Sequence, residues 1–176
     1  MSTATTSLAA GITRGIDALS DWTGRGIAWL TLAMALCGVA VVLLRYGFGI
    51  GLVWLQESVT WLHAAVFMLG AGWTLRQDGH VRVDVFYRRM SPRQQALVDL
   101  VGTLVFLLPL CGYLLFESLP YVMNSWRILE RSREAGGLPG LYLVKSLIPL
   151  MALLLALAGV AEALRAWARF TASPER

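Results

Sequence analysis

Long stretches of this sequence lack charge altogether. Aspartate, glutamate, lysine and arginine are all absent from residues 26–44, 58–75, 100–116 and 146–161. Hydrophobic residues make up 57% of the chain, whereas soluble globular domains contain roughly 45–50% apolar residues. These two observations exclude an ordinary soluble domain.

Each uncharged stretch is close to the length of a membrane crossing. A helix needs about 20 mostly apolar residues to cross a bilayer, and a few flanking residues bring each stretch to that length. The sequence therefore predicts an all-α integral membrane bundle of four transmembrane helices with amphipathic interfacial segments. We expect an N-terminal arm at 1–25, spans near 26–44, 53–75, 96–119 and 143–164, and a tail at 165–176.

Cysteine and histidine are scarce, which excludes several kinds of site. Cys37 and Cys111 each lie within an expected span, and no CxxC or metal-ligand spacing occurs. The histidine positions disfavour a haem held by two histidines, because His63 lies within a span and His80 lies outside it. We interpret His63 as a hydrogen-bonded packing residue. No nucleophile–base pair, phosphate loop or dinucleotide fingerprint occurs, so we expect no catalytic residue, metal or cofactor, and no enzyme activity.

Basic residues are distributed unequally between the connections. The arm, the segment between the second and third spans and the tail together carry ten arginines, and the other two connections carry four arginines and one lysine. Cytoplasmic segments of membrane proteins are enriched in lysine and arginine. We therefore expect both termini in the cytoplasm. The formal net charge of +4 then indicates contact with lipid headgroups, not with nucleic acid.

Two connecting segments have the periodicity of amphipathic helices. In the arm, apolar residues recur at helical spacing beside a charged stripe that contains Asp17 and Asp21. The arm could lie in the membrane interface or extend the first span as a helix packed on protein. From Pro120 onward the sequence predicts an outer interfacial helix, which Gly136 and Gly137 would end.

Four charged residues are expected in one layer near the outer ends of the spans: Arg45, Glu57, Glu117 and Lys145. Charges inside a membrane are costly. They could pair with each other or reach water, they could contact a partner subunit, or a carboxylate could couple protons or ions.

The stretch "GHVRVDVFYRRMSP" alternates apolar and polar residues, which is typical of a half-buried strand. Counted from Arg76 just before this stretch, the polar positions Arg76, His80 and Asp84 also recur every four residues, which favours a helical continuation of span two or an irregular loop. A cytoplasmic turn at the membrane surface, helical in part, accommodates both patterns. Ser91, followed by proline and then Gln94, predicts a capping box that starts the next helix.

The order of several motifs resembles a known family. Arg45-Tyr46 closes span one, Trp54 and Glu57 open span two, and "LGAGWTLRQDGHVRVDVF" follows. The later "SWRILERSREAGGLPGLYLVKSLIPL" contains Glu130 and Lys145. From about residue 22 to residue 164, the chain is similar to the small permease subunit of tripartite ATP-independent periplasmic (TRAP) transporters.

The resemblance implies a function in sodium-coupled uptake of an organic acid across the bacterial inner membrane. The small subunit would act as a scaffold for a large permease subunit, which would hold the sodium and substrate sites, and a periplasmic protein would deliver the substrate. A stand-alone homodimeric exporter that uses Glu57, or a membrane anchor of a respiratory oxidoreductase, are alternatives. We expect subunit-interface or structural roles for nine residues: Arg45, Trp54, Glu57, Arg76, His80, Asp84, Glu117, Glu130 and Lys145.

Overall fold

The computed structural model describes residues 3–80 and 84–172, and this part of the chain folds into long helices. In chain order these are α1 (Thr3–Val42), α2 (Val53–Arg76), α3 (Asp84–Tyr87), α4 (Pro92–Gly102), α5 (Leu108–Arg127) and α6 (Leu141–Thr171). Two π-helical turns, η1 (Leu43–Gly47) and η2 (Thr103–Leu107), continue α1 and join α4 to α5.

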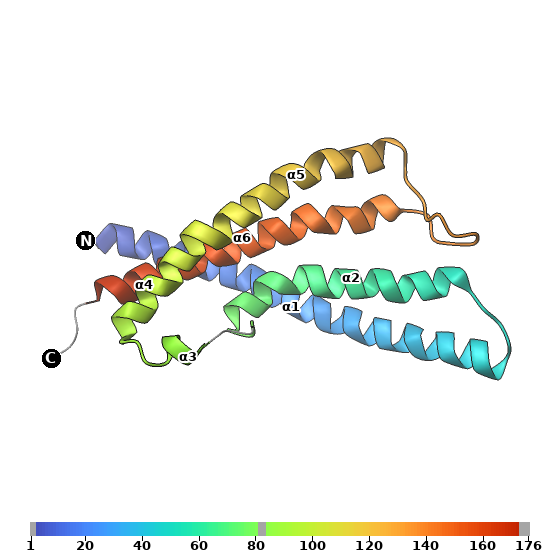
Figure 1. The fold of residues 1–176 in the computed structure, drawn as a ribbon, viewed down its shortest axis with the longest axis horizontal. Coiled ribbons are helices and arrows are strands. Elements are labelled where there is room, and N and C mark those ends of the chain that lie inside the picture. Colours follow the sequence, from blue (N-terminus) through green and yellow to red (C-terminus); the bar gives the residue numbers. More distant parts are fainter. Residues whose placement is uncertain (1–2, 81–83, 173–176) are drawn as a thin grey trace.

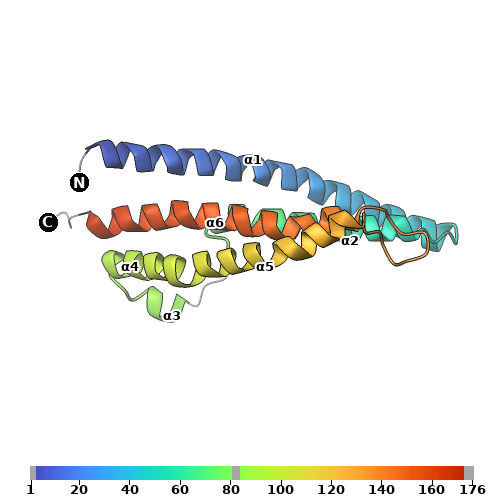
Figure 2. The same cartoon turned by 90° about the horizontal axis from the view of Figure 1, so that it is seen from above.

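Four helical rods are long and apolar enough to cross a membrane: Ala9–Gly47, Val53–Arg76, Pro92–Arg127 and Leu141–Thr171. The predicted fold class, an all-α membrane protein with four spans, is thereby confirmed. α1 packs on α2, α2 packs on α6, and α6 packs on α4 and α5. In the right half of Figure 1 these rods lie side by side in the order α1, α2, α6, α5, and on the left α1 crosses behind α6. Figure 2 shows that the N-terminal part of α1 lies apart from α4.

The two ends of the molecule differ. Both termini and α3 lie at one end, which we call the terminal end, and the connections 48–52 and 128–140 lie at the other, which we call the distal end (Figure 1). Rods that are consecutive in the chain therefore run in opposite directions, as short connections require, whereas the neighbours α2 and α6 run in the same direction.

Small residues allow the central helices to approach closely. α6 buries a series of alanines, of which Ala152, Ala161 and Ala166 are fully covered. A Cβ atom built on Gly72 of α2 would lie 3.0 Å from the carbonyl oxygen of Leu154 in α6. Without a hydrophobic driving force between helices in lipid, such close backbone packing stabilises helix association.

The arm and the first span form one continuous helix. α1 runs from Thr3 to Val42 without a break. Asp17 on this helix forms ion pairs with Arg76 of α2 and Arg165 of α6. The structure therefore supports the second alternative for the arm, a helical extension of the first span that is packed on protein.

The outer interfacial helix expected after Pro120 is wrong. α5 passes through Pro120 without ending and stops at Arg127. The amide of Glu130 then donates to the carbonyl of Ser125, and Leu129 adopts a left-handed conformation with φ of 48°. This is the Schellman pattern, which ends a helix by satisfying its last carbonyl groups. This helix end could not be predicted from the residue type at position 129, because the left-handed position is more commonly a glycine.

The segment after span two is a loop with one helical turn. α2 ends at Arg76, so the helical continuation toward Asp84 is wrong. Asp78, with φ of 54°, closes α2 by the same hydrogen-bond pattern. Residues 81–83, which carry the alternation, lie outside the described residues. The capping box at Ser91 is confirmed: its hydroxyl accepts from the Gln94 amide, and the Gln94 side chain accepts from the Ser91 amide.

Candidate functional site

At the distal end, Glu57 holds the connection 130–140, which we call the distal hairpin. Arg131 and Pro139 pair across it as an antiparallel bridge. One carboxylate oxygen of Glu57 accepts from the Ser132 hydroxyl, and the other accepts from the Leu138 amide at 2.6 Å. Glu57 lies on the second turn of α2, so this carboxylate fixes a loop 75–81 residues away to that helix.

Gly137 is required for this close approach. A Cβ atom at this position would lie 2.5 Å from the Ser132 hydroxyl and 2.8 Å from a Glu57 carboxylate oxygen. A larger residue would therefore displace the hairpin from α2. The glycine, proposed from the sequence as a helix stop, is instead needed for packing.

A second carboxylate, Glu130, holds the base of the distal hairpin to α6. It accepts from Lys145 and, at 2.6 Å, from the hydroxyl of Ser125. The hydrogen bond from Lys145, followed by that from Ser125, lowers the pKa of the Glu130 carboxyl from its ordinary value. The Lys145 ammonium also lies 4.1 Å from the centre of the Tyr121 ring, which adds a cation–π contact to α5.

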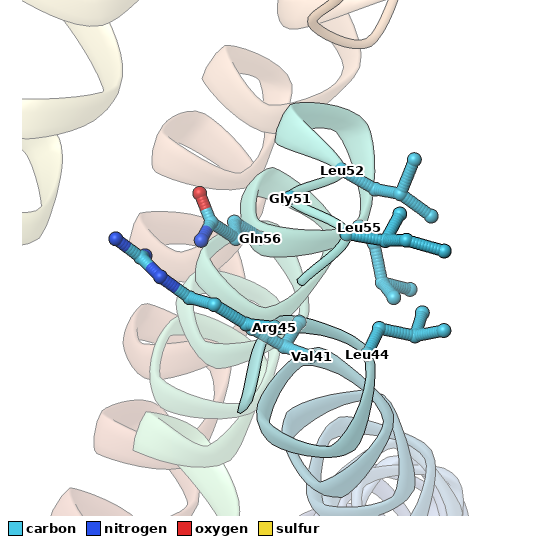
Figure 3. Close-up of a pocket in the computed structure, with 8 residues that line it drawn as sticks. Val41, Leu44, Arg45, Gly51, Leu52, Leu55 and Gln56 are labelled. Atoms are coloured by element: carbon cyan, nitrogen blue, oxygen red, sulfur yellow. The ribbon is translucent and has the colours of Figure 1, made fainter. Parts of the chain in front are cut away.

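Of the predicted layer of four charges, the structure pairs none with another. Glu57 and Lys145 have the partners just described, while Arg45 and Glu117 are exposed and have no hydrogen-bond or ion-pair partner in the described part of the chain. Arg45 lines a small pocket at the end of α1. Figure 3 shows its side chain on the same side as Gln56, whereas Leu52 and Leu55 point the other way. Trp54 is 46% exposed.

At the terminal end, Arg76 anchors an ion-pair cluster. Its guanidinium pairs with Asp17 at 3.2 Å and with Asp21, and it donates to the Asp17 carbonyl at 2.9 Å. Arg165 of α6 reaches the same Asp17 carboxylate at 3.1 Å. One carboxylate of α1 thus joins three helices.

The cluster continues along α6 to α4. Glu162 accepts from Arg165 at 3.0 Å and from Arg169 at 2.7 Å, and Arg169 also pairs with Asp99 at 3.2 Å. Asp99 in turn accepts from the Tyr87 hydroxyl of α3 at 2.8 Å. We call these residues, together with Arg76, Asp17 and Asp21, the terminal cluster.

From the terminal cluster, sequence reasoning singled out only Arg76 for an interface or structural role. Two signals could have identified most of its other members. Asp17 and Asp21 are four residues apart, and Glu162, Arg165 and Arg169 recur at helical spacing just after an uncharged span. Both patterns place charges of opposite sign at the same end of neighbouring helices.

The two histidines take no part in the contacts of the distal hairpin or in the terminal cluster. His63 is exposed on α2 and has no hydrogen bond among the described residues, so its interpretation as a hydrogen-bonded packing residue is wrong. His80 is exposed and likewise without a described partner. Asp84 begins α3.

The contacts of the distal hairpin and the terminal cluster are both suited to holding helices together. Their carboxylates are paired with cations or accept hydrogen bonds from hydroxyls and amides of this chain. Among the described residues, no three histidine, cysteine or acidic side chains gather where they could hold a metal ion. Glu57, on which the exporter alternative rests, is occupied by Ser132 and Leu138.

Comparison with known proteins gives one match. The family model for the DctQ component of tripartite ATP-independent periplasmic transporters matches residues 34–169. This range contains both the distal hairpin and most of the terminal cluster. No curated protein and no solved structure matches the chain.

Proposed function

The chain belongs to the DctQ component family of TRAP transporters, and from this premise we propose that it is a scaffold subunit for sodium-coupled uptake of an organic acid. It is a multi-pass protein of the inner membrane, in a family of transporter components, not of enzymes. In our proposal a large permease subunit carries the sodium and substrate sites, and a periplasmic binding protein delivers the carboxylate.

The family match carries this proposal, and the placement of the charges supports it. A chain that bound a carboxylate and sodium itself would need free polar groups gathered within its spans. Here Glu57 is engaged by Ser132 and Leu138, and Glu130 is paired with Lys145. A chain whose distal carboxylates are used to hold its own fold suits a scaffold that stays fixed while a partner moves.

We further propose that the terminal end faces the cytoplasm and the distal hairpin faces the periplasm. The distribution of arginines supports this orientation. A single cysteine placed in the hairpin at Arg133, in a chain whose Cys37 and Cys111 are replaced by serine, should react with a membrane-impermeant maleimide in intact cells. Labelling of a cysteine at Arg169 but not at Arg133 would reverse the orientation.

Reconstitution tests the transport function. Proteoliposomes should accumulate a labelled carboxylate only when this chain, a large permease subunit and a periplasmic binding protein are all present. An inward sodium gradient should be required, and replacing sodium by potassium serves as the control. Full uptake without this chain, or uptake by this chain alone, would contradict the proposal.

A further inference from the structure

Glu117 is a carboxylate on the open side of a spanning helix. It lies on α5 and is exposed, whereas Ser118, the next residue, is buried against the rest of the chain. No hydrogen bond or ion pair reaches Glu117 from the described residues. The carboxylates of Glu57 and Glu130, at the same end of the molecule, each have two partners.

Glu117 lies within the apolar rod, not at its end. α5 ends at Arg127, and ten residues of helix correspond to ~15 Å along the axis. Tyr121, one turn nearer the end, contacts the Lys145 ammonium. A glutamate side chain lacks the long stem by which lysine and arginine reach water from within a span. Exposure of this carboxylate to lipid alone would be costly.

The residues beside Glu117 form a polar stripe along α5. At 3.6 residues per turn, Leu110, Tyr113, Tyr121 and Asn124 project within about 40° of Glu117. We call these five residues the Glu117 stripe. All are exposed, Tyr113 by 64% and Tyr121 by 51%. Phenol, amide and carboxylate groups on one helix face are the groups that hydrogen-bond across helices in membranes.

We propose that the Glu117 stripe is the surface on which a transmembrane helix of the large permease subunit docks, with a lysine or arginine of that helix paired to Glu117. The inference rests on the proposed function, since it names where the partner binds. Charge complementarity commits the site to a basic helix: an unpaired carboxylate within a span requires a cation at the same depth. Glu117 then fixes the register of the two helices, and the phenols and the amide align them.

A second copy of this chain fits the stripe less well. At the distal end, two other charges on the spanning rods have no partner among the described residues: Arg45, which follows α1, and Arg127, which ends α5 ten residues beyond Glu117. α1 and α5 lie at opposite edges of the row of helices (Figure 1). Pairing Arg45 of one copy with Glu117 of the next would be a heterologous contact, which forms rings or open chains and not a closed pair.

Co-purification tests the docking surface. The affinity-tagged small subunit is expressed with the large subunit, extracted in mild detergent, and the retained large subunit is quantified. We expect Glu117→Lys to lower retention at least tenfold by placing two cations together, and Glu117→Gln, which keeps the shape, to lower it severalfold. Leu119→Lys is the matched control, because Leu119 is exposed at nearly the same depth on another face of α5; it should retain the partner.

A photoreactive phenylalanine analogue at Tyr113 identifies the occupant directly. An adduct with the large subunit is expected, and its loss in the Glu117→Lys background supports the pairing. An adduct with a second small subunit, or with lipid alone, would overturn the proposal. So would equal retention by wild type, Glu117→Lys and Leu119→Lys, provided that each small subunit elutes as a monodisperse species.

The same experiment separates the two proposals. A wild-type chain that retains no large subunit contradicts both the scaffold function and the docking surface. Retention by wild type that Glu117→Lys leaves unchanged contradicts the docking surface alone.

Discussion

Individual residues close the connections of this molecule. Leu129 and Asp78 adopt left-handed conformations, which glycine adopts without strain and other residues do not. Glu57 and Glu130 fix the distal hairpin through hydrogen bonds to residues distant in sequence. Neither carboxylate could be paired correctly from the sequence, because Ser132 and Leu138 come near Glu57 only after the hairpin folds back on α2.

Leu129→Gly should stabilise the protein. The left-handed conformation costs a non-glycine residue about 1–2 kcal/mol, and Leu129 is 59% exposed, so little packing is lost. We expect a gain of about 1 kcal/mol, reduced in part by the greater freedom of glycine in the unfolded chain. The thermal unfolding midpoint in detergent measures it. Ile128→Gly is the control: with φ of −96°, this neighbour gains nothing from glycine and should be destabilised.

The Glu130–Lys145 pair should be insensitive to pH near neutrality and fail in acid. The folded-state pKa of Glu130 lies below its ordinary value, which is about 4.3 for a free glutamate. Its contribution is therefore complete above the unfolded pKa and is lost as pH falls through the lower folded pKa. The difference in unfolding midpoint between wild type and Glu130→Gln should be constant from about pH 7 to pH 5 and should shrink below about pH 4. A difference that already declines between pH 7 and pH 5 would contradict this assignment.

At the scale of the helices, glycines decide which faces meet. Gly72 and Gly70 both lie on α2, and both could serve as small residues between spans. Only Gly72 meets backbone: its Cβ would lie 3.0 Å from the Leu154 carbonyl oxygen, whereas that of Gly70 would lie 3.8 Å from the end of the Ile27 side chain. Hydropathy predicted the span itself, but the choice between these two glycines depends on how α2 is rotated against α6.

Gly72→Ala should therefore destabilise the protein, and Gly70→Ala should not. The added methyl group at Gly72 forces α2 away from α6, and overpacking of this kind costs roughly 1–3 kcal/mol. At Gly70 the methyl group fits, and alanine favours the helix by about 1 kcal/mol. Unfolding midpoints of the two variants, measured in the same detergent, should move in opposite directions. Equal shifts would mean that the α2–α6 contact is looser than the structure has it.

At the scale of the whole molecule, the rods form an open row and not a closed bundle. α1 lies at one edge, where α2 is its main neighbour. Near the terminal end, Asp17 ties this edge to both α2 and α6. An open row leaves apolar faces such as those of α1 and α5 free for lipid or a partner, which suits a subunit that functions within a larger complex.

Asp17→Asn should loosen α1 more than Asp21→Asn does. Asp17 pairs with Arg76 and Arg165, whereas Asp21 pairs with Arg76 alone and is more exposed, at 47% against 28%. Because these groups are partly exposed, we expect a loss of only about 1 kcal/mol for Asp17→Asn and less for Asp21→Asn. Protease sensitivity of α1, together with the unfolding midpoint, measures the effect, and raising the salt concentration should narrow the gap between wild type and variant. A larger effect of Asp21→Asn would mean that Asp21, and not Asp17, is the main residue that holds α1 to its neighbours.

The sequence by itself determined the four spans, the capping box at Ser91 and the family, because hydropathy, helix starts and motif order are local properties of the chain. Only the tertiary structure decided that Glu57 binds the distal hairpin, that Lys145 pairs with Glu130, that α1 is one helix tied by Asp17, and that Glu117 has no partner among the described residues. These outcomes depend on how each rod is rotated and how far it is shifted along its neighbours. Side-chain packing between residues far apart in the chain sets both quantities, and no local pattern encodes them.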